Sequence, residues 1–309
     1  MPFVPAWFNR IRRSLGVCAA AATLAWLNLA PPVQAGETEP MVFIHHAKES
    51  AGDTRYEYHW RVLRAALDAT TAQWGPYELR EAPYMNETRQ VAELSNATGL
   101  LNTMVLDTTV ELEQKLLPVR LPIDKGLLGY RVFLIRKDDQ AAFSQVRTLQ
   151  QLRAFSIGQG ADWSDTQILR QAGFKVVTGY AYEGLFGMLN YRRFDAFSRG
   201  AVEVLGEMRS FGPQYPDMQI EESLLLYYPM PVYFWFSRDS AGQQRARRVE
   251  QGMRAIQANG TLDRLFKTEF SAVEATLRLK ERRVLRIGNP LLPAASRTID
   301  KRWLYDPTR

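Results

Sequence analysis

The chain has 309 residues, of which 46% are apolar, and a formal net charge of +6. This size suits one large domain or two lobes of ordinary size. The composition is not that of a disordered protein. The positive charge is too small to indicate a nucleic-acid partner.

A basic start and an apolar run mark the first 35 residues. Arg10, Arg12 and Arg13 precede the apolar residues 15–30, and small residues lead up to Ala35. This layout predicts a signal peptide cleaved after Ala35, with export to the periplasm. A membrane anchor is the alternative, although the run falls short of the ~20 residues that a span needs. The general secretory route is the default, and the twin-arginine route stays open.

The only cysteine, Cys18, lies inside this segment. The processed chain, residues 36–309, therefore can form no disulfide and no cysteine metal site. Removing residues 1–35 takes three of the 39 Lys and Arg and none of the 33 Asp and Glu. The remaining 36 bases and 33 acids give a net charge of +3.

From residue 41 onward, short apolar runs alternate with amphipathic helical patterns. Residues 41–44 have the pattern of a buried strand, and apolar residues at steps of three and four predict a long helix over 56–74. Further strands are expected at 77–80 and 100–106, and helices at 87–97 and 109–116. Strands that alternate with helices predict a parallel sheet with right-handed crossovers.

The strong strand pattern at 131–136 starts a second α/β set. Strands are expected at 155–157, 175–178 and 194–198, with helices at 163–171 and 182–191 between them. Strands at 224–228 and 231–237 and two long helices follow. These patterns predict two lobes: residues 36–129 with 230–309 form lobe one, and 130–229 form lobe two. The basic, proline-containing tail, 275–309, is expected to pack on lobe one as an extended strap.

Several segments carry a resemblance to a known family. Over residues 120–270 closely, and 40–119 loosely, the chain resembles the family-3 extracellular solute-binding proteins of ABC importers. The segments are Gly129-Tyr130-Arg131-Val132-Phe133-Leu134-Ile135-Arg136-Lys137-Asp138, Phe155-Ser156-Ile157-Gly158-Gln159-Gly160, Arg193-Phe194-Asp195-Ala196-Phe197 and Ala258-Asn259-Gly260-Thr261-Leu262. The resemblance implies a two-lobed α/β fold of the periplasmic-binding-protein type. Two crossing strands join its lobes, and a hinge motion closes them on a solute.

Ligands of open α/β sheets lie beyond the carboxyl ends of strands. The loops at these ends supply the candidate ligand-binding residues. They are His45, Asp107, Thr108, Thr109, Arg120, Gly158, Gly160, Trp163, Tyr180 and Arg199. The amides that open the helix after Gly160 can donate to a carboxylate or a phosphate. The alternative at that place is an ordinary glycine turn with an N-cap.

Two ligand anchors implied by the resemblance are missing. Leu112 stands where the family has a carboxylate-binding arginine, and Gly200 stands where it has an acid for an α-amino group. Arg120 and Arg199 are candidates to replace the lost cation, which favours an anionic small solute. Arg199→Ala is then expected to weaken binding far more than folding. Solvated surface arginines are the alternative interpretation.

The function expected from these features is capture of a small polar, anionic solute by a monomer, with delivery to an ABC permease. A module that senses the solute for a membrane receptor is the alternative. Three histidines without metal spacing indicate no metal, and nothing indicates a cofactor. A hydrolase using Glu49, Asp53 or Asp195 is a weaker hypothesis, because no motif of a known hydrolase class occurs. We therefore expect a binding protein and not an enzyme.

Overall fold

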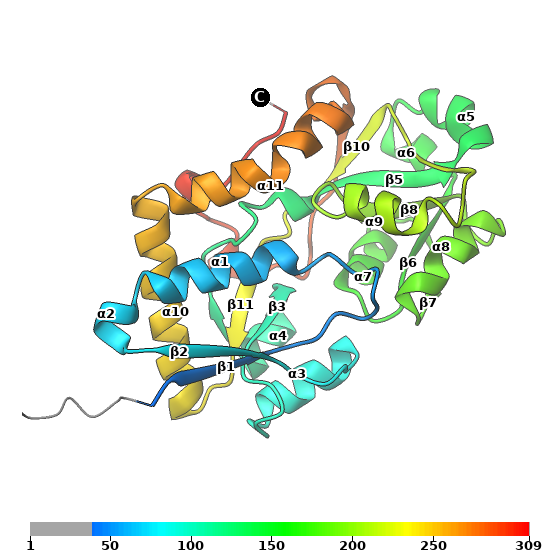
Figure 1. Cartoon of the computed structure of the whole chain (residues 1–309). Coiled ribbons are helices and arrows are strands. Elements are labelled where there is room, and N and C mark those ends of the chain that lie inside the picture. The colour runs from blue at the N-terminus through cyan, green and yellow to red at the C-terminus, as the bar shows by residue number, and fades with distance from the viewer. Residues whose placement is uncertain (1–38, 309) are drawn as a thin grey trace, which may run out of the picture. The chain divides into compact units, whose positions relative to one another are not determined.

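The computed structural model describes residues 39–308. The predicted signal peptide and its cleavage site lie outside these residues. Within them, no helix is long and apolar enough to cross a membrane. Helices and strands alternate along the described chain, and the strands form two separate groups (Figure 1).

The first group of strands belongs to lobe one. It contains β1 (Met41–His45), β2 (Tyr77–Glu81), β3 (Met104–Asp107), β4 (Leu117–Val119) and β11 (Val232–Phe236). β1 pairs with β2 in parallel, and β11 lies antiparallel between β3 and β4. A bridge between His45 and Thr103 connects the two parts. The carboxyl end of β1 therefore lies beside Thr103, the residue that precedes β3.

Six helices accompany these strands. They are α1 (Glu57–Asp68), α2 (Thr71–Trp74), α3 (Glu87–Ser95), α4 (Val110–Lys115), α10 (Ser240–Ala258) and α11 (Thr261–Leu277). The predicted helix over 56–74 is thus two helices, because the chain turns at Ala69 and Thr70. Asn86 and Thr109 cap α3 and α4 through their side chains. Both caps place a helix start beside the carboxyl end of a strand.

The second group of strands forms one sheet in the order β12-β10-β5-β8-β6-β7, with β9 beside β5. Its strands are β5 (Tyr130–Arg136), β6 (Ser156–Gly160), β7 (Lys175–Gly179), β8 (Ala196–Gly200), β9 (Met218–Ile220), β10 (Leu224–Tyr227) and β12 (Arg283–Arg286). Its helices are α5 (Gln140–Ser144), α6 (Leu149–Leu152), α7 (Ser164–Gln171), α8 (Tyr182–Asn190) and α9 (Val204–Phe211). These elements lie together on the right of Figure 1.

The tail differs from the expected strap on lobe one. Its strand β12 pairs in parallel with β10 and so extends the sheet of the second lobe. Arg282, which is buried, fixes this pairing by donating to the carbonyls of Leu277 and Leu224. The chain then returns to lobe one, where the Val110 amide donates to the Leu291 carbonyl. The tail therefore contacts both lobes, and the predicted lobe bounds remain a prediction.

The largest apolar cluster is continuous through both lobes. It includes Leu63 and Val249 on α1 and α10, Leu134 on β5, and Phe186 on α8, none of which is exposed. Smaller clusters fill the far side of each sheet. Because this cluster contains residues of both strand groups, it holds the two sheets against each other.

Helix α10 approaches α1 more closely at Gly252 than a side chain would permit. A Cβ at this position would lie 2.1 Å from the Ala66 carbonyl oxygen. Gly252→Ala should therefore lower the free energy of unfolding by about 1–3 kcal/mol through overpacking. Urea denaturation measures the change. Gly184→Ala on α8 is the matched control, since its Cβ would meet only Ala181 at 3.6 Å. The control should raise stability by up to about 1 kcal/mol, and equal effects at both sites would contradict this packing.

Candidate functional site

A cavity of about 70 Å³ has walls from both strand groups. From lobe one come Leu106 and Asp107, at the end of β3, and from lobe two come Trp163 and Ser164, at the start of α7. The Ser164 hydroxyl donates to Asp107 Oδ2 over 2.7 Å. This hydrogen bond joins the two sides where α7 begins.

A larger open space of about 960 Å³ adjoins the small cavity. Glu87, Leu106, Asp107, Trp163 and Ser164 line both of them. The larger space runs between α3 and α4 on one side and α7 on the other. A solute with its head group in the small cavity would have room for its remainder here.

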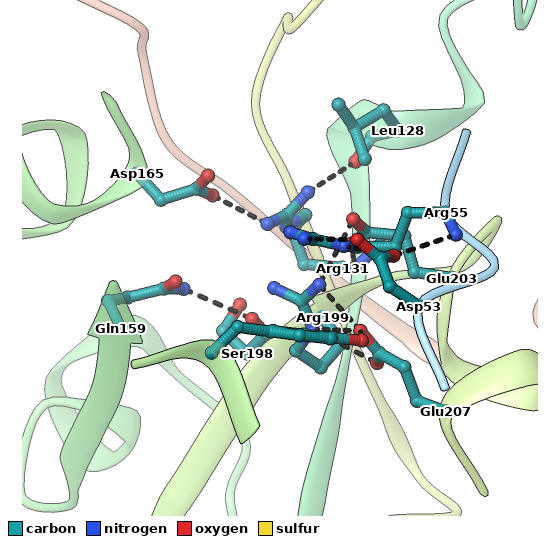
Figure 2. Close-up of polar contacts among 12 residues, drawn as sticks. Asp53, Arg55, Leu128, Arg131, Gln159, Asp165, Ser198, Arg199, Glu203 and Glu207 are labelled. Carbon is teal, nitrogen blue, oxygen red and sulfur yellow. Dashed lines mark hydrogen bonds and ion pairs between the residues drawn. The ribbon is translucent and has the colours of Figure 1, made fainter. Parts of the chain in front are cut away.

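Three buried guanidinium groups line the small cavity, and Figure 2 shows them side by side with carboxylates around them. Arg131, on β5, pairs with Asp165 at 2.7 Å and donates to the Leu128 carbonyl. Arg199, on β8, lies 3.0 Å from Glu203 and 2.6 Å from Glu207. Both side chains are 1% exposed. Their charges are therefore neutralised within the protein.

The third guanidinium belongs to Arg55, in the loop before α1. Its Nε and Nη2 donate to the two oxygens of Asp53 at 2.8 and 2.9 Å, and Nη2 also donates to Glu49 at 2.7 Å. Its Cζ lies 3.9 Å from the centre of the Tyr182 ring on α8. A cation over an aromatic face at this distance is attracted by the ring. Arg55 is held by lobe one and stacked on lobe two.

The acids of this site titrate differently because their surroundings differ. Burial opposes ionisation of Glu203, but Arg199 and Arg131 outweigh it and lower the pKa. Burial raises the pKa of Glu207 despite Arg199. For Glu87 and Asp107, burial raises the pKa to about 8 and about 6. Within residues 39–308, no Lys or Arg nitrogen lies within ion-pair distance of these last two.

Tyr56, which lies next to Arg55 in the chain, belongs to a group of packed aromatic rings. His46 meets Tyr56 and Trp60 edge to face at 4.3 and 4.9 Å, and His45 stacks on Trp60. Burial lowers the pKa of His46 to about 3 and that of His59 to about 4. Both imidazoles are therefore neutral at pH 7, and His59 lines the small cavity.

The structure brings together most of the residues proposed from the sequence. Asp107, Trp163 and Arg199 line the small cavity, Asp107, Thr109 and Trp163 line the larger space, and Gly160, Trp163 and Tyr180 line a third pocket of about 30 Å³. Asp107 and Trp163 are shared by the small cavity and the larger space, whereas Tyr180 is 90% exposed. Arg199 lies inside β8 and not past the end of a strand.

The other four proposed residues contact protein groups outside these cavities. Arg120 pairs with Glu113 at 2.7 Å, and the Thr108 hydroxyl donates to the same carboxylate. His45 stacks on Trp60. A Cβ at Gly158 would meet the Phe194 ring at 2.2 Å, so this glycine serves packing. None of the four lines a cavity described here.

Six of the other residues that line the small cavity carry a charged or imidazole side chain and were not among the sequence candidates: Arg55, His59, Glu87, Arg131, Asp165 and Glu203. A partial signal existed for Arg131, because a charged residue at the start of an otherwise apolar strand must find a partner when the strand is buried. Nothing in the sequence shows that Glu87 faces Asp107.

The three carboxylates considered as hydrolase residues all bind groups of the protein itself. Glu49 and Asp53 both bind Arg55, and Asp195 accepts from the backbone amide and hydroxyl of Ser156. In the described part of the chain, no three His, Cys, Asp or Glu side chains cluster in a way that could hold a metal ion. The site can therefore bind a small molecule through hydrogen bonds and charged groups in a partly closed cavity.

No protein-family model matches the chain, and no curated protein matches it in sequence. Solved structures match in fold. An arginine-specific periplasmic binding protein of Salmonella typhimurium has a TM-score of 0.56 at 14% identity, covering 74% of this chain and 99% of its own. The GluR0 ligand-binding core of Nostoc punctiforme, bound to L-glutamate, has a TM-score of 0.52 at 15% identity, covering 75% and 99%.

The fold is that of the two-lobed periplasmic binding proteins. This confirms the α/β fold class that the sequence resemblance implied. A histidine kinase sensor domain with similarity to periplasmic binding proteins also matches, with a TM-score of 0.55 at 12% identity over 75% of this chain and 96% of its own. The same fold thus occurs in transport and in sensing.

Arg199→Ala should destabilise the protein, contrary to the expectation from sequence. Removing this guanidinium leaves Glu203 and Glu207 buried without it, which costs about 3–5 kcal/mol of unfolding free energy. Urea denaturation at pH 7 tests this. Arg254→Ala is the control, because that arginine forms an exposed helical pair with Glu250 and should change stability by less than ~0.5 kcal/mol. Similar midpoints for the two variants would show that the buried network adds no stability.

Glu87→Gln should stabilise the protein at alkaline pH. The pKa of Glu87 is about 8 in the folded protein and exceeds the ordinary value of 4.5 for this side chain, so wild-type stability falls as the pH rises from 4.5 to 8. Burial is the main cause, and Asp107, Glu49 and Asp162 add to it against Arg55. The carboxylate is partly exposed, so we expect a gain of about 1–2 kcal/mol at pH 8.5 and little at pH 4.5. A gain that is equal at both pH values would contradict the raised pKa.

Proposed function

We propose that this protein captures a small polar solute between its two α/β lobes, outside the cytoplasm, as a divergent member of the solute-binding family that its sequence resembles. The observation that carries the proposal is the small cavity whose walls come from the strand ends of both lobes. Strand ends at such a place are where open α/β sheets bind ligands. The fold likeness to periplasmic binding proteins supports the same interpretation.

Closure is supported by contacts that cross the cavity. Ser164 on α7 donates to Asp107 on β3, and Arg55 stacks on Tyr182. Opening the lobes would break both contacts. A solute that adds contacts to each wall would shift the balance towards the closed arrangement by its differential affinity.

The anionic solute expected from the sequence has lost its main support. Arg199 and Arg120, the proposed replacements for the missing cation, both pair with glutamates of the same lobe. An anion would have to displace these partners.

Two partners suit a protein of this kind. Delivery to an ABC permease is the first, since a structural neighbour is the substrate-binding protein of an amino-acid ABC transporter. A membrane sensor is the second, since another neighbour is the sensor domain of a histidine kinase. A permease gene or a sensor gene beside this one would separate them.

A thermal-shift screen tests solute capture. Residues 36–309 are mixed with amino acids, amines, dicarboxylates, phosphorylated compounds and sugars. A true ligand at 100 times its Kd should stabilise the folded protein by about 2.7 kcal/mol and raise the melting temperature accordingly. Trp163→Ala, which removes a side chain lining the small cavity and the larger space, should reduce the shift. Trp74→Ala serves as the control, because Trp74 lines neither the small cavity nor the larger space. No shift with any compound class would contradict the proposal.

A further inference from the structure

Two carboxylates in the wall of the small cavity have no cationic partner in the described chain. Each guanidinium there already has one: Asp53 for Arg55, Asp165 for Arg131, and Glu203 and Glu207 for Arg199. Glu87 and Asp107 remain. Glu87 forms no side-chain hydrogen bond among residues 39–308, and Asp107 accepts one from Ser164. The wall therefore has two acidic groups that no cation of the described chain neutralises.

His59 adds an independent observation. Its side chain lines the same cavity and is only 7% exposed, and the Arg55 backbone, its one polar contact among residues 39–308, cannot satisfy both ring nitrogens. A buried polar group without a partner is costly. A neutral imidazole offers one acceptor and one donor. A ligand N–H group in the cavity would satisfy the acceptor nitrogen.

A solute carboxylate would find the opposite situation. All three guanidinium groups that line the cavity are bound to protein carboxylates at 2.6–3.0 Å. A ligand carboxylate would displace one of these partners or lie against the unpaired Glu87 and Asp107. Both alternatives cost free energy, because like charges at short range repel most strongly where water is scarce. The cavity thus disfavours an amino acid's carboxylate.

Resting on the proposed capture of a solute, we propose that the ligand is an organic amine or guanidine without a carboxylate, whose positive nitrogen binds between Glu87 and Asp107 and donates to His59. The Trp163 ring lines the same cavity and already carries the Arg199 guanidinium 4.7 Å from its centre. The rest of the solute extends into the larger space, which begins at these two acids. Because His59 is neutral at pH 7, its ring does not repel the positive charge of the ligand.

The pKa of Glu87 is consistent with this site. Burial raises it to about 8, and Asp107 contributes as the first of the neighbouring acids. A cation between the two carboxylates would remove part of that penalty, because an opposite charge stabilises the ionised form. A cationic ligand would therefore complete the charge arrangement of the cavity wall.

Matched pairs of compounds test the inference. Agmatine, putrescine and cadaverine differ from arginine, ornithine and lysine only in lacking the carboxylate. Calorimetric titration at pH 8 measures the Kd of all six for residues 36–309. At least one amine should bind at least tenfold more tightly than its amino acid. An amino acid that binds as tightly as its amine, or tighter, would overturn the inference.

Variants locate the site. Glu87→Gln should weaken binding of that amine at least tenfold while folding at least as well as the wild type, so lost binding is separate from lost structure. Glu93→Gln is the same substitution on the same helix, at a side chain that bonds to Thr98, and should leave the Kd within twofold. Unchanged affinity in Glu87→Gln would also overturn the inference.

Failure of the inference and failure of the proposed function give different results. If none of the six compounds binds but a dicarboxylate, a phosphorylated compound or a sugar does, the cation site is wrong and solute capture stands. If no compound of any class binds, both are wrong.

Discussion

The buried guanidinium groups of Arg55, Arg131 and Arg199 constrain everything around the cavity. A charge removed from water costs several kcal/mol unless carboxylates and hydrogen bonds surround it. The chain meets this requirement from within, using the loop before α1, the start of α7 and helix α9. Each of these segments must hold its position to keep its arginine neutral. The geometry of the cavity walls therefore follows from charge pairing as much as from apolar packing.

The loop before α1 shows how this pairing joins the lobes. Its Arg55 is fixed by Asp53 of the same loop and lies on Tyr182 of lobe two. Gly206 on α9 leaves the space that Thr54 occupies, since a Cβ there would lie 2.5 Å from the Thr54 hydroxyl oxygen. A segment of lobe one thus packs into lobe two through side chains of the protein itself. The closed arrangement does not depend on a ligand alone.

Local patterns predicted most of the fold, because strands and helices with strong periodicity were long enough to be distinguished. Helix α9 was missed because Gly206 and Ser210 interrupt its apolar stripe. Strand β12 was missed because its four residues, two apolar side chains between two arginines, give little signal. The site was predicted less well. Asp107 and Trp163 follow strands and could be found by position. Glu87 follows a helix cap, and its place opposite Asp107 depends on how β1, β2 and β3 are arranged in space.

The strand β12 has a mechanical consequence. Two segments are enough to connect the lobes of such a fold, and here they are the chain entering β5 and the chain leaving β10. The tail adds two more passages, one into β12 and one back to the amide of Val110. Two rigid bodies tied at four points retain fewer independent rotations than bodies tied at two. Bending about a single axis remains available, while twisting would stretch at least one tether. Any opening of the lobes would therefore have to move the tail as well, because it contacts both of them.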